Sequence, residues 1–198
     1  DGEAAGFISG YLKPTDPTTL FIWQVAVDSR FRGRRLASRM LADVVARSGA
    51  ERLETTITSD NAASIALFTG LARDHGTFLN LDMEDYKDLD LTIAVFTAIL
   101  DQEDMRGYEA GIVLQAYLPD ALPALERLID FAVARRAAGG APIKVRLVKG
   151  ANLAMERVEA VMHGWEQAPY TAKADVDANY LRCVERALRP DAVGALRI

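Results

Sequence analysis

Charged and polar side chains stand at the carboxyl ends of three predicted strands in the second part of the chain. Amides, guanidinium groups and carboxylates of this kind bind anions, move protons and orient heteroatoms of a ligand. In parallel βα arrangements the active site lies at this end of the strands. A capped loop would explain any one of these residues, but the same placement on three successive strands favours a site. With the strand that carries each, they are Asp82 (77–82), Gln115 (111–117) and Arg146 (143–148), with Lys149 directly after the last strand.

The stretch Ile143–Asn152 shows how such residues are positioned. Residues 143–148 alternate between an apolar face and a face that carries Lys144 and Arg146, which predicts a strand. Gly150 turns the chain out of the strand, and Asn152 can cap the helix that follows. An edge strand with one solvated face remains the alternative for this stretch taken alone.

Strands and helices alternate through this part of the chain at intervals of about 30 residues, a pattern typical of a parallel sheet or βα barrel. Gly139-Gly140 ends one of the helices. The sequence therefore predicts an α/β fold for residues 77–198. Its expected helices span 89–100, 121–138, 153–162 and 175–188, and a further strand spans 195–198.

The first part of the chain has a different order of elements. Strands at 6–11 and 20–27 flank a turn rich in Pro and Thr at 14–19, which predicts a hairpin. A helix at 36–47, a strand at 52–58 and a helix opening at Asn61 or Ser64 follow.

A loop that joins the hairpin to its helix concentrates arginines around Gly33. A run of like charges is usually a solvated helix face, but free backbone N–H groups and the helix dipole make a helix start an anion site. Arginine adds charge-assisted hydrogen bonds to phosphate. One glycine is a weak signal, so the pattern alone leaves both interpretations open. The arginines are Arg30, Arg32, Arg34, Arg35 and Arg39.

Composition narrows the class of protein. The chain has 198 residues, half of them hydrophobic, a net charge of −5 and one cysteine. Its charge balance argues against nucleic acid as a partner, and no apolar run approaches the roughly 18 residues of a membrane span. A single cysteine and the lack of a signal peptide favour the cytoplasm. No metal-ligand spacing is seen. The chain starts at Asp1 without methionine, and we expect that this is not its natural amino terminus.

Four separated motifs in the second part carry a resemblance. "FLNLDMEDYKDLDLTIAVF", "AGIVLQAYLPDAL", "IKVRLVKGANLAMERVEA" and "APYTAKADVDANYLRCV" resemble the proline dehydrogenase barrel of bifunctional proline-utilisation flavoproteins. The resemblance implies part of a (β/α)8 barrel that binds FAD and oxidises L-proline to 1-pyrroline-5-carboxylate. It implies that Asp82 lies beside the substrate and that Arg146 acts at the flavin. The implied FAD-binding residues are Gln115, Arg146, Val148, Gly150, Ala151, Thr171 and Lys173.

The first part resembles another family. "FIWQVAVDSRFRGRRLASRML" and "LETTITSDNAASIALFTGLARDHG" are similar to GNAT acetyltransferases, and within them to L-2,4-diaminobutyrate acetyltransferase of ectoine biosynthesis. This implies a partial α+β segment that binds acetyl-CoA, whose thioester the amine of diaminobutyrate attacks. Arg35 stands where the family's phosphate loop usually has glycine. The implied acetyl-CoA residues are Val25, Val27, Arg32, Gly33, Arg34, Arg35, Ala37 and Asn61.

Neither resemblance covers a whole domain. The opening elements of the acetyltransferase and both ends of the barrel have no counterpart, and no linker joins the two parts. We therefore interpret the chain as a chimera of segments 1–76 and 77–198. A proline dehydrogenase-like fragment is the leading hypothesis, an N-acetyltransferase the second and an inactive scaffold the third. An open set of barrel strands leaves unpaired edges, which favour self-association.

Overall fold

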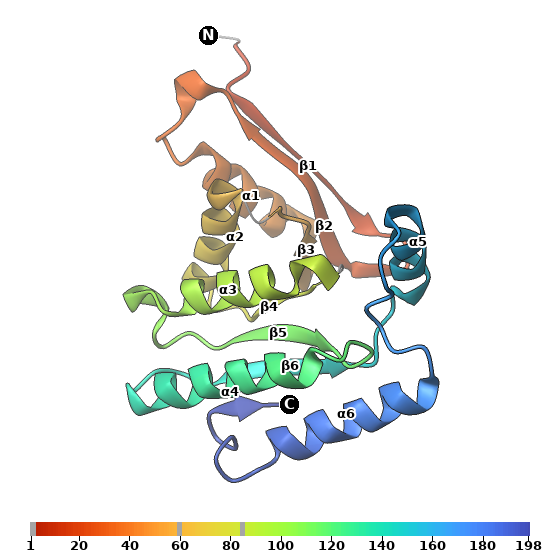
Figure 1. The fold of residues 1–198 in the computed structure, drawn as a ribbon. Helices are drawn as coiled ribbons and strands as arrows, with labels where there is room; N and C mark the ends of the chain where they lie inside the picture. Colours follow the sequence, from red (N-terminus) through yellow and green to blue (C-terminus); the bar gives the residue numbers. More distant parts are fainter. Residues whose placement is uncertain (1–2, 59–60, 84–85) are drawn as a thin grey trace. The chain divides into compact units, whose positions relative to one another are not determined.

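A computed structural model describes residues 3–58, 61–83 and 86–198 (Figure 1). The chain divides into two compact units, a first unit of Asp1–His75 and a second unit of Gly76–Ile198. Both are mixtures of helices and strands, and each contains its own sheet.

The first unit has a three-stranded sheet in the order β1-β2-β3. Strands β1 (Gly6–Lys13) and β2 (Asp16–Val27) form an antiparallel hairpin, and β3 (Arg52–Thr55) runs parallel to β2. The helical elements are η1 (Ser29–Phe31), α1 (Leu36–Ser48) and α2 (Ala62–Asp74). A small core joins sheet and helices through Leu20, Ile22, Leu41 and Phe68.

The hairpin turn is tighter than the predicted turn at 14–19, because β2 already begins at Asp16. The Asp16 carboxylate accepts hydrogen bonds from the hydroxyls of Thr18 and Thr19, both at 2.7 Å, and from Arg52 Nη2 at 2.6 Å. These bonds tie the start of β2 to β3. Strand β3 itself ends at Thr55, three residues before the predicted end.

The second unit has a four-stranded parallel sheet in the order β4-β5-β6-β7. Its strands are β4 (Leu79–Leu81), β5 (Ala110–Gln115), β6 (Ile143–Val148) and β7 (Leu196–Arg197). Between them lie η2 (Tyr86–Asp88), α3 (Leu89–Leu100), η3 (Glu103–Met105), α4 (Ala121–Ala137), α5 (Leu153–His163) and α6 (Lys173–Ala187).

Strand β5 forms the centre of the second unit. All six of its residues are buried, helices α3 and α4 contact it, and α6 contacts β6. Strand β6 keeps the predicted alternation: Ile143 and Val145 are buried, whereas Lys144 and Arg146 are exposed. Both faces of the sheet are therefore covered at β5, whereas at β6 one face is buried and the other carries exposed Lys144 and Arg146.

Helix α5 is less embedded than its neighbours. Only Ala160 is buried, and large apolar side chains of the helix and of the residues after it remain exposed. The Trp165 ring stacks on His163, with ring centroids 4.4 Å apart. The exposed apolar residues are Met155, Val158, Val161, Met162 and Trp165.

Candidate functional site

A row of side chains crosses the carboxyl end of the sheet in the second unit. Arg146 Nη2 on β6 donates to both oxygens of Asp82, at 3.0 and 2.9 Å, although β5 lies between β4 and β6. Val113 of β5 is in register with Arg146, and Asn80 of β4 donates to Asp82. Both members of the ion pair are about half exposed. A solvent-exposed ion pair therefore spans β5, the strand between β4 and β6.

Gln115, the last residue of β5, joins the loops on either side of it. Its side chain is 4% exposed, its Nε2 donates to the Met83 carbonyl at 3.0 Å, and its Oε1 accepts from the Ala151 N–H at 3.4 Å. A buried amide held at both ends fixes the positions of the neighbouring backbone. Gln115 thus sets the geometry of the strand ends around the Asp82–Arg146 pair.

Beyond the strands the backbone pairing of β5 and β6 continues into the loops. The Ala116 N–H donates to Val148 O, and the Tyr117 N–H donates to Lys149 O, both at 2.7 Å. Gly150 follows with φ of +125°, and a Cβ at this position would lie 2.5 Å from the Tyr117 ring. Only glycine allows this conformation and this close approach.

An open pocket of about 250 Å³ lies beside this loop. Three of the residues expected to contact a cofactor line it, namely Gly150, Thr171 and Lys173. Buried Asn179 of α6 donates to the carbonyls of Ala116 and Leu118, both at 3.0 Å, and so fixes α6 against the end of β5. The remaining lining residues are Tyr117, Lys149, Leu153, Tyr170, Ala172, Val176 and Asp177.

The rim of the pocket carries a three-membered ion cluster. Lys149 Nζ lies 2.6 Å from Asp177 Oδ1, and Lys173 Nζ lies 2.5 Å from Asp177 Oδ2. Hydrogen bonds from Lys149 and Lys173 hold the pKa of the Asp177 carboxyl below its usual value. The cluster carries one net positive charge, which suits an anionic ligand.

In the first unit the arginine loop ends at a strained position. Gly33 has φ of +76° and Arg35, which caps α1, has φ of +56°. The left-handed region is costly for a residue with a side chain. Arg32, Gly33, Arg34 and Arg35 are exposed and Ala37 is half-buried, while the Arg34 guanidinium lies 5.4 Å from the Phe31 ring centroid.

One edge of β2 is open where acetyl-CoA contacts are expected. Val25 and Val27 pair with β1, opposite Ile8 and Gly6. Strand β3 pairs with β2 only over Thr19–Ile22, so in the described ranges 3–58 and 61–83 the edge of β2 at 23–27 that faces away from β1 has no strand partner. Asn61 is the N-cap of α2, with its Oδ1 accepting from Ser64 N–H at 3.1 Å.

Several residues that shape the pocket were not predicted from the sequence. Tyr117 and Asn179 act through packing and backbone contacts, for which the sequence carries no signal. Asp177 had one: it stands four residues after Lys173, the spacing of a helical ion pair. Among the residues that the structure describes, no group of three or more His, Cys, Asp or Glu residues is placed to bind a metal. None of the helices described has the length and apolar character that a membrane crossing requires.

Comparisons with known proteins divide between two families. L-2,4-diaminobutyric acid acetyltransferase of Streptomyces avermitilis is 47% identical over 87 residues, which are 42% of this chain and 49% of the relative. The enzyme of Vibrio parahaemolyticus is 58% identical over 73 residues, 35% of this chain and 40% of the relative. The chain thus spans half or less of these curated relatives.

Solved structures of the other family match a larger share of the chain. Proline utilization A from Corynebacterium freiburgense aligns with a TM-score of 0.66 and 42% identity, covering 81% of this chain and 18% of that protein. The protein from Bdellovibrio bacteriovorus gives 0.62 and 34%, covering 73% and 16%. Together with the acetyltransferase matches, this makes the chain a two-part chimera. Because residues 24–197 match the proline dehydrogenase family, the chain belongs to that family.

Proposed function

We propose that residues 77–198 are part of a proline dehydrogenase (β/α)8 barrel that binds FAD and oxidises L-proline to 1-pyrroline-5-carboxylate. The observation that carries the proposal is the meeting of Asp82, Gln115 and Arg146 at the carboxyl ends of three adjacent parallel strands. This is the end at which βα barrels carry out chemistry.

The residues present fit a flavin dinucleotide. Gly150 brings bare backbone to the wall of the pocket, where a side chain would strike Tyr117. Lys149, Lys173 and the Thr171 side chain stand around the same pocket and supply the donors that phosphate and ribityl oxygens require. We infer that Val148 and Ala151 line the flavin, and that Thr171 and Lys173 bind its ribityl and phosphate portion.

Bound FAD would supply the acceptor for the hydride that L-proline loses together with a proton. Arg146 holds a permanent positive charge, which would stabilise the electron-rich product of that transfer. The second hydrogen of Gln115 Nε2 would donate to a flavin heteroatom, while the first stays on Met83 O. Asp82 would lie beside the substrate and hold Arg146 in place until a ligand arrives.

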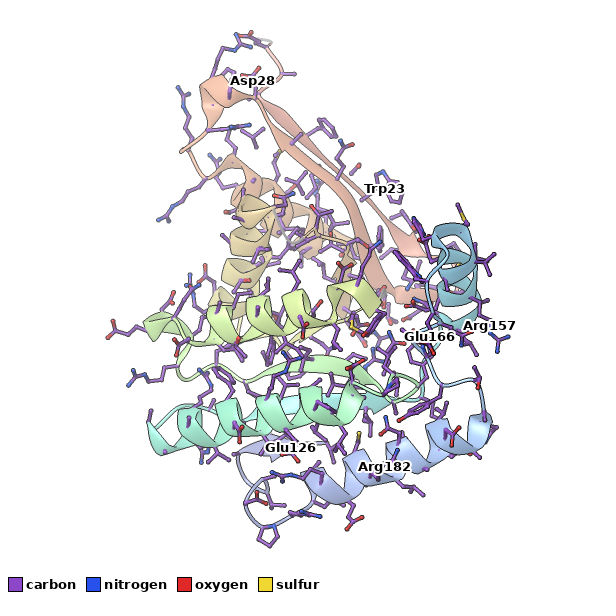
Figure 2. All side chains as sticks on the ribbon, viewed as in Figure 1. Trp23, Asp28, Glu126, Arg157, Glu166 and Arg182 are labelled. Carbon is purple, nitrogen blue, oxygen red and sulfur yellow. The ribbon has the colours of Figure 1, made fainter. Side chains whose placement is uncertain are left out.

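The test is the visible absorption of the purified chain after incubation with excess FAD and removal of unbound flavin. We expect a retained flavin band in the parent chain and its loss in Arg146→Ala. Arg157→Ala removes an exposed guanidinium from α5, labelled in Figure 2, and is expected to keep the band. Flavin retained by Arg146→Ala, or no flavin in the parent, would contradict the assignment.

Self-association would pair the edges of the sheet in the second unit. Strands β4 and β7 are the two edges of the four-stranded sheet, and edges of this kind pair readily with other chains. We therefore propose that flavin binding accompanies oligomer formation. Sedimentation velocity with and without FAD tests this, and a flavin-loaded monomer would overturn it.

A second candidate is acetyl-CoA-dependent acetylation of L-2,4-diaminobutyrate by residues 1–76. The specific observation in its favour is the open edge of β2 beside Val25 and Val27, followed by the loop of Arg32, Gly33, Arg34 and Arg35 at the start of α1. Stabilisation of the first unit by acetyl-CoA, lost in Arg32→Ala and kept in Arg47→Ala, would support it. If neither FAD nor acetyl-CoA binds, the inactive-scaffold hypothesis stands.

A further inference from the structure

Asp177 connects two parts of the pocket that are far apart in sequence. It lies on α6, one turn after Lys173, and its second oxygen reaches Lys149 in the loop after β6. The Lys149 ammonium also lies 5.9 Å from the Tyr180 ring centroid. Each lysine has three N–H donors, so the contact with Asp177 leaves donors on both for a ligand.

The three members of the cluster differ from one another in exposure. The side chain of Asp177 is 35% exposed and that of Lys149 is 52% exposed, whereas Lys173 is 82% exposed. The carboxylate is thus the inner member and the ammonium groups face outward. Long lysine side chains lose conformational freedom when a ligand immobilises them. A carboxylate that already holds them removes part of that cost.

We propose that Asp177 is a positioning residue for a phosphate-bearing ligand, and that it holds Lys149 and Lys173 at the rim of the pocket in the arrangement that receives a pyrophosphate or phosphate ester. The inference deepens the proposed flavin site, on which it rests for the identity of the ligand. Asp177 makes no contact with the ligand itself and acts through the two lysines.

A purely neutralising role for Asp177 would change the affinity for an anion in the opposite direction. If Asp177 only neutralised the lysines and competed with the ligand, Asp177→Asn would add net positive charge and tighten the binding of an anion. If Asp177 positions them, the same change weakens binding despite the added charge. The direction of the change therefore decides between the two roles.

The experiment compares FAD with riboflavin, which has the flavin ring but no phosphate, by flavin fluorescence titration of the full chain. We expect Asp177→Asn to weaken FAD binding about fivefold and to leave riboflavin binding unchanged. Asp177→Glu is expected to restore most of the affinity. Asp175→Asn, which removes an exposed carboxylate from the same helix, is the matched control. Equal weakening for both ligands would indicate a merely structural role and overturn the proposal, as would tighter binding of FAD.

Inorganic pyrophosphate tests the inference without flavin. Isothermal titration at low ionic strength is expected to show binding to the parent chain and to Asp175→Asn, and weaker binding to Asp177→Asn. If pyrophosphate binds in this pattern but FAD does not, the flavin proposal fails and the positioning role survives. Pyrophosphate that binds all three chains equally, or none of them, would overturn the positioning role.

Discussion

Arginines show how differently the two units are built. In the second unit Arg135 of α4 is 8% exposed and donates to the carbonyls of Leu100, Met105, Arg106, Tyr108 and Ala141. In the first unit Arg32, Arg34 and Arg35 all stand exposed on one loop. The buried arginine binds backbone carbonyls that are distant from one another in the sequence, whereas the exposed ones lie at the protein surface.

Strand burial differs in the same direction. Strand β5 is buried over its whole length, whereas β2 buries only Leu20 and Ile22 among its apolar residues and leaves Trp23 72% exposed (Figure 2). A fully buried strand fixes the residues at its end, and this is where Gln115 lies. The second unit therefore has the rigid frame that a preorganised site requires, whereas the first unit has a charged loop on a small core.

The largest expected effect comes from removing the buried guanidinium. Arg135→Met removes a buried donor shared by five backbone carbonyls, of which those of Met105 and Arg106 keep a backbone N–H partner, so we expect the second unit to lose about 3 to 5 kcal/mol of unfolding free energy. Arg136→Met removes a neighbour with one hydrogen bond, to Gly140 O, and should cost about 1 kcal/mol or less. Urea unfolding followed by hydrogen-exchange mass spectrometry measures both. Equal losses in the two variants would contradict the role of the buried guanidinium in the frame of the second unit.

A matched pair of leucine truncations compares the cores of the two units directly. Leu114 in β5 and Leu41 in α1 are both fully buried. Leu114→Ala should cost about 3 to 4 kcal/mol because its surroundings are buried on all sides and collapse little. Leu41→Ala should cost about 2 to 3 kcal/mol, since the half-buried residues around it can relax. Hydrogen-exchange protection of peptides from each unit measures the two losses of unfolding free energy. A larger loss for Leu41→Ala would contradict the view that the second unit is the more rigid of the two.

The smallest effect concerns acid stability of the first unit. The hydroxyls of Thr18 and Thr19 and the Arg52 guanidinium hold the pKa of Asp16 far below its usual value. A depressed folded-state pKa adds stability above the unfolded pKa of about 4, and this stability is lost as the pH falls through the folded value. The variant Asp16→Asn should therefore be less stable at neutral pH, and the stability of its first unit should fall less steeply as the pH is lowered. Exchange protection across that range tests this, with Asp43→Asn as control, and an unchanged slope would contradict it.

Element positions were largely predictable where one period dominates the sequence. The apolar run of α3 and the alternation of β6 gave the observed bounds, 89–100 and 143–148. Ends set by a pairing partner were not predictable from one strand alone. Strand β4 was expected over 77–82, but it pairs with β5 only through Leu79–Leu81. Helix α6 begins at Lys173, two residues before the predicted start.

The candidate site was predictable in its members more than in its contacts. The sequence placed Asp82, Gln115 and Arg146 at strand ends, yet the ion pair of Asp82 with Arg146 depends on strand order, because β5 lies between their strands. Likewise, Gly150 was expected near a cofactor, but its need for glycine arises from the Tyr117 ring. Contacts between distant segments carry no local sequence pattern, so only the assembled sheet reveals them.

Cys183 is a chemical probe of local opening at α6. It is the chain's one cysteine, it is fully buried on that helix, and burial raises the pKa of its thiol to about 11. Oxidants and alkylating reagents attack the thiolate. Near neutral pH the thiol is therefore unreactive while α6 is packed against the rest of the second unit. The same helix carries Lys173, Asp177 and Asn179. The rate at which the sulfur is modified would therefore measure local opening of α6 at this wall of the pocket.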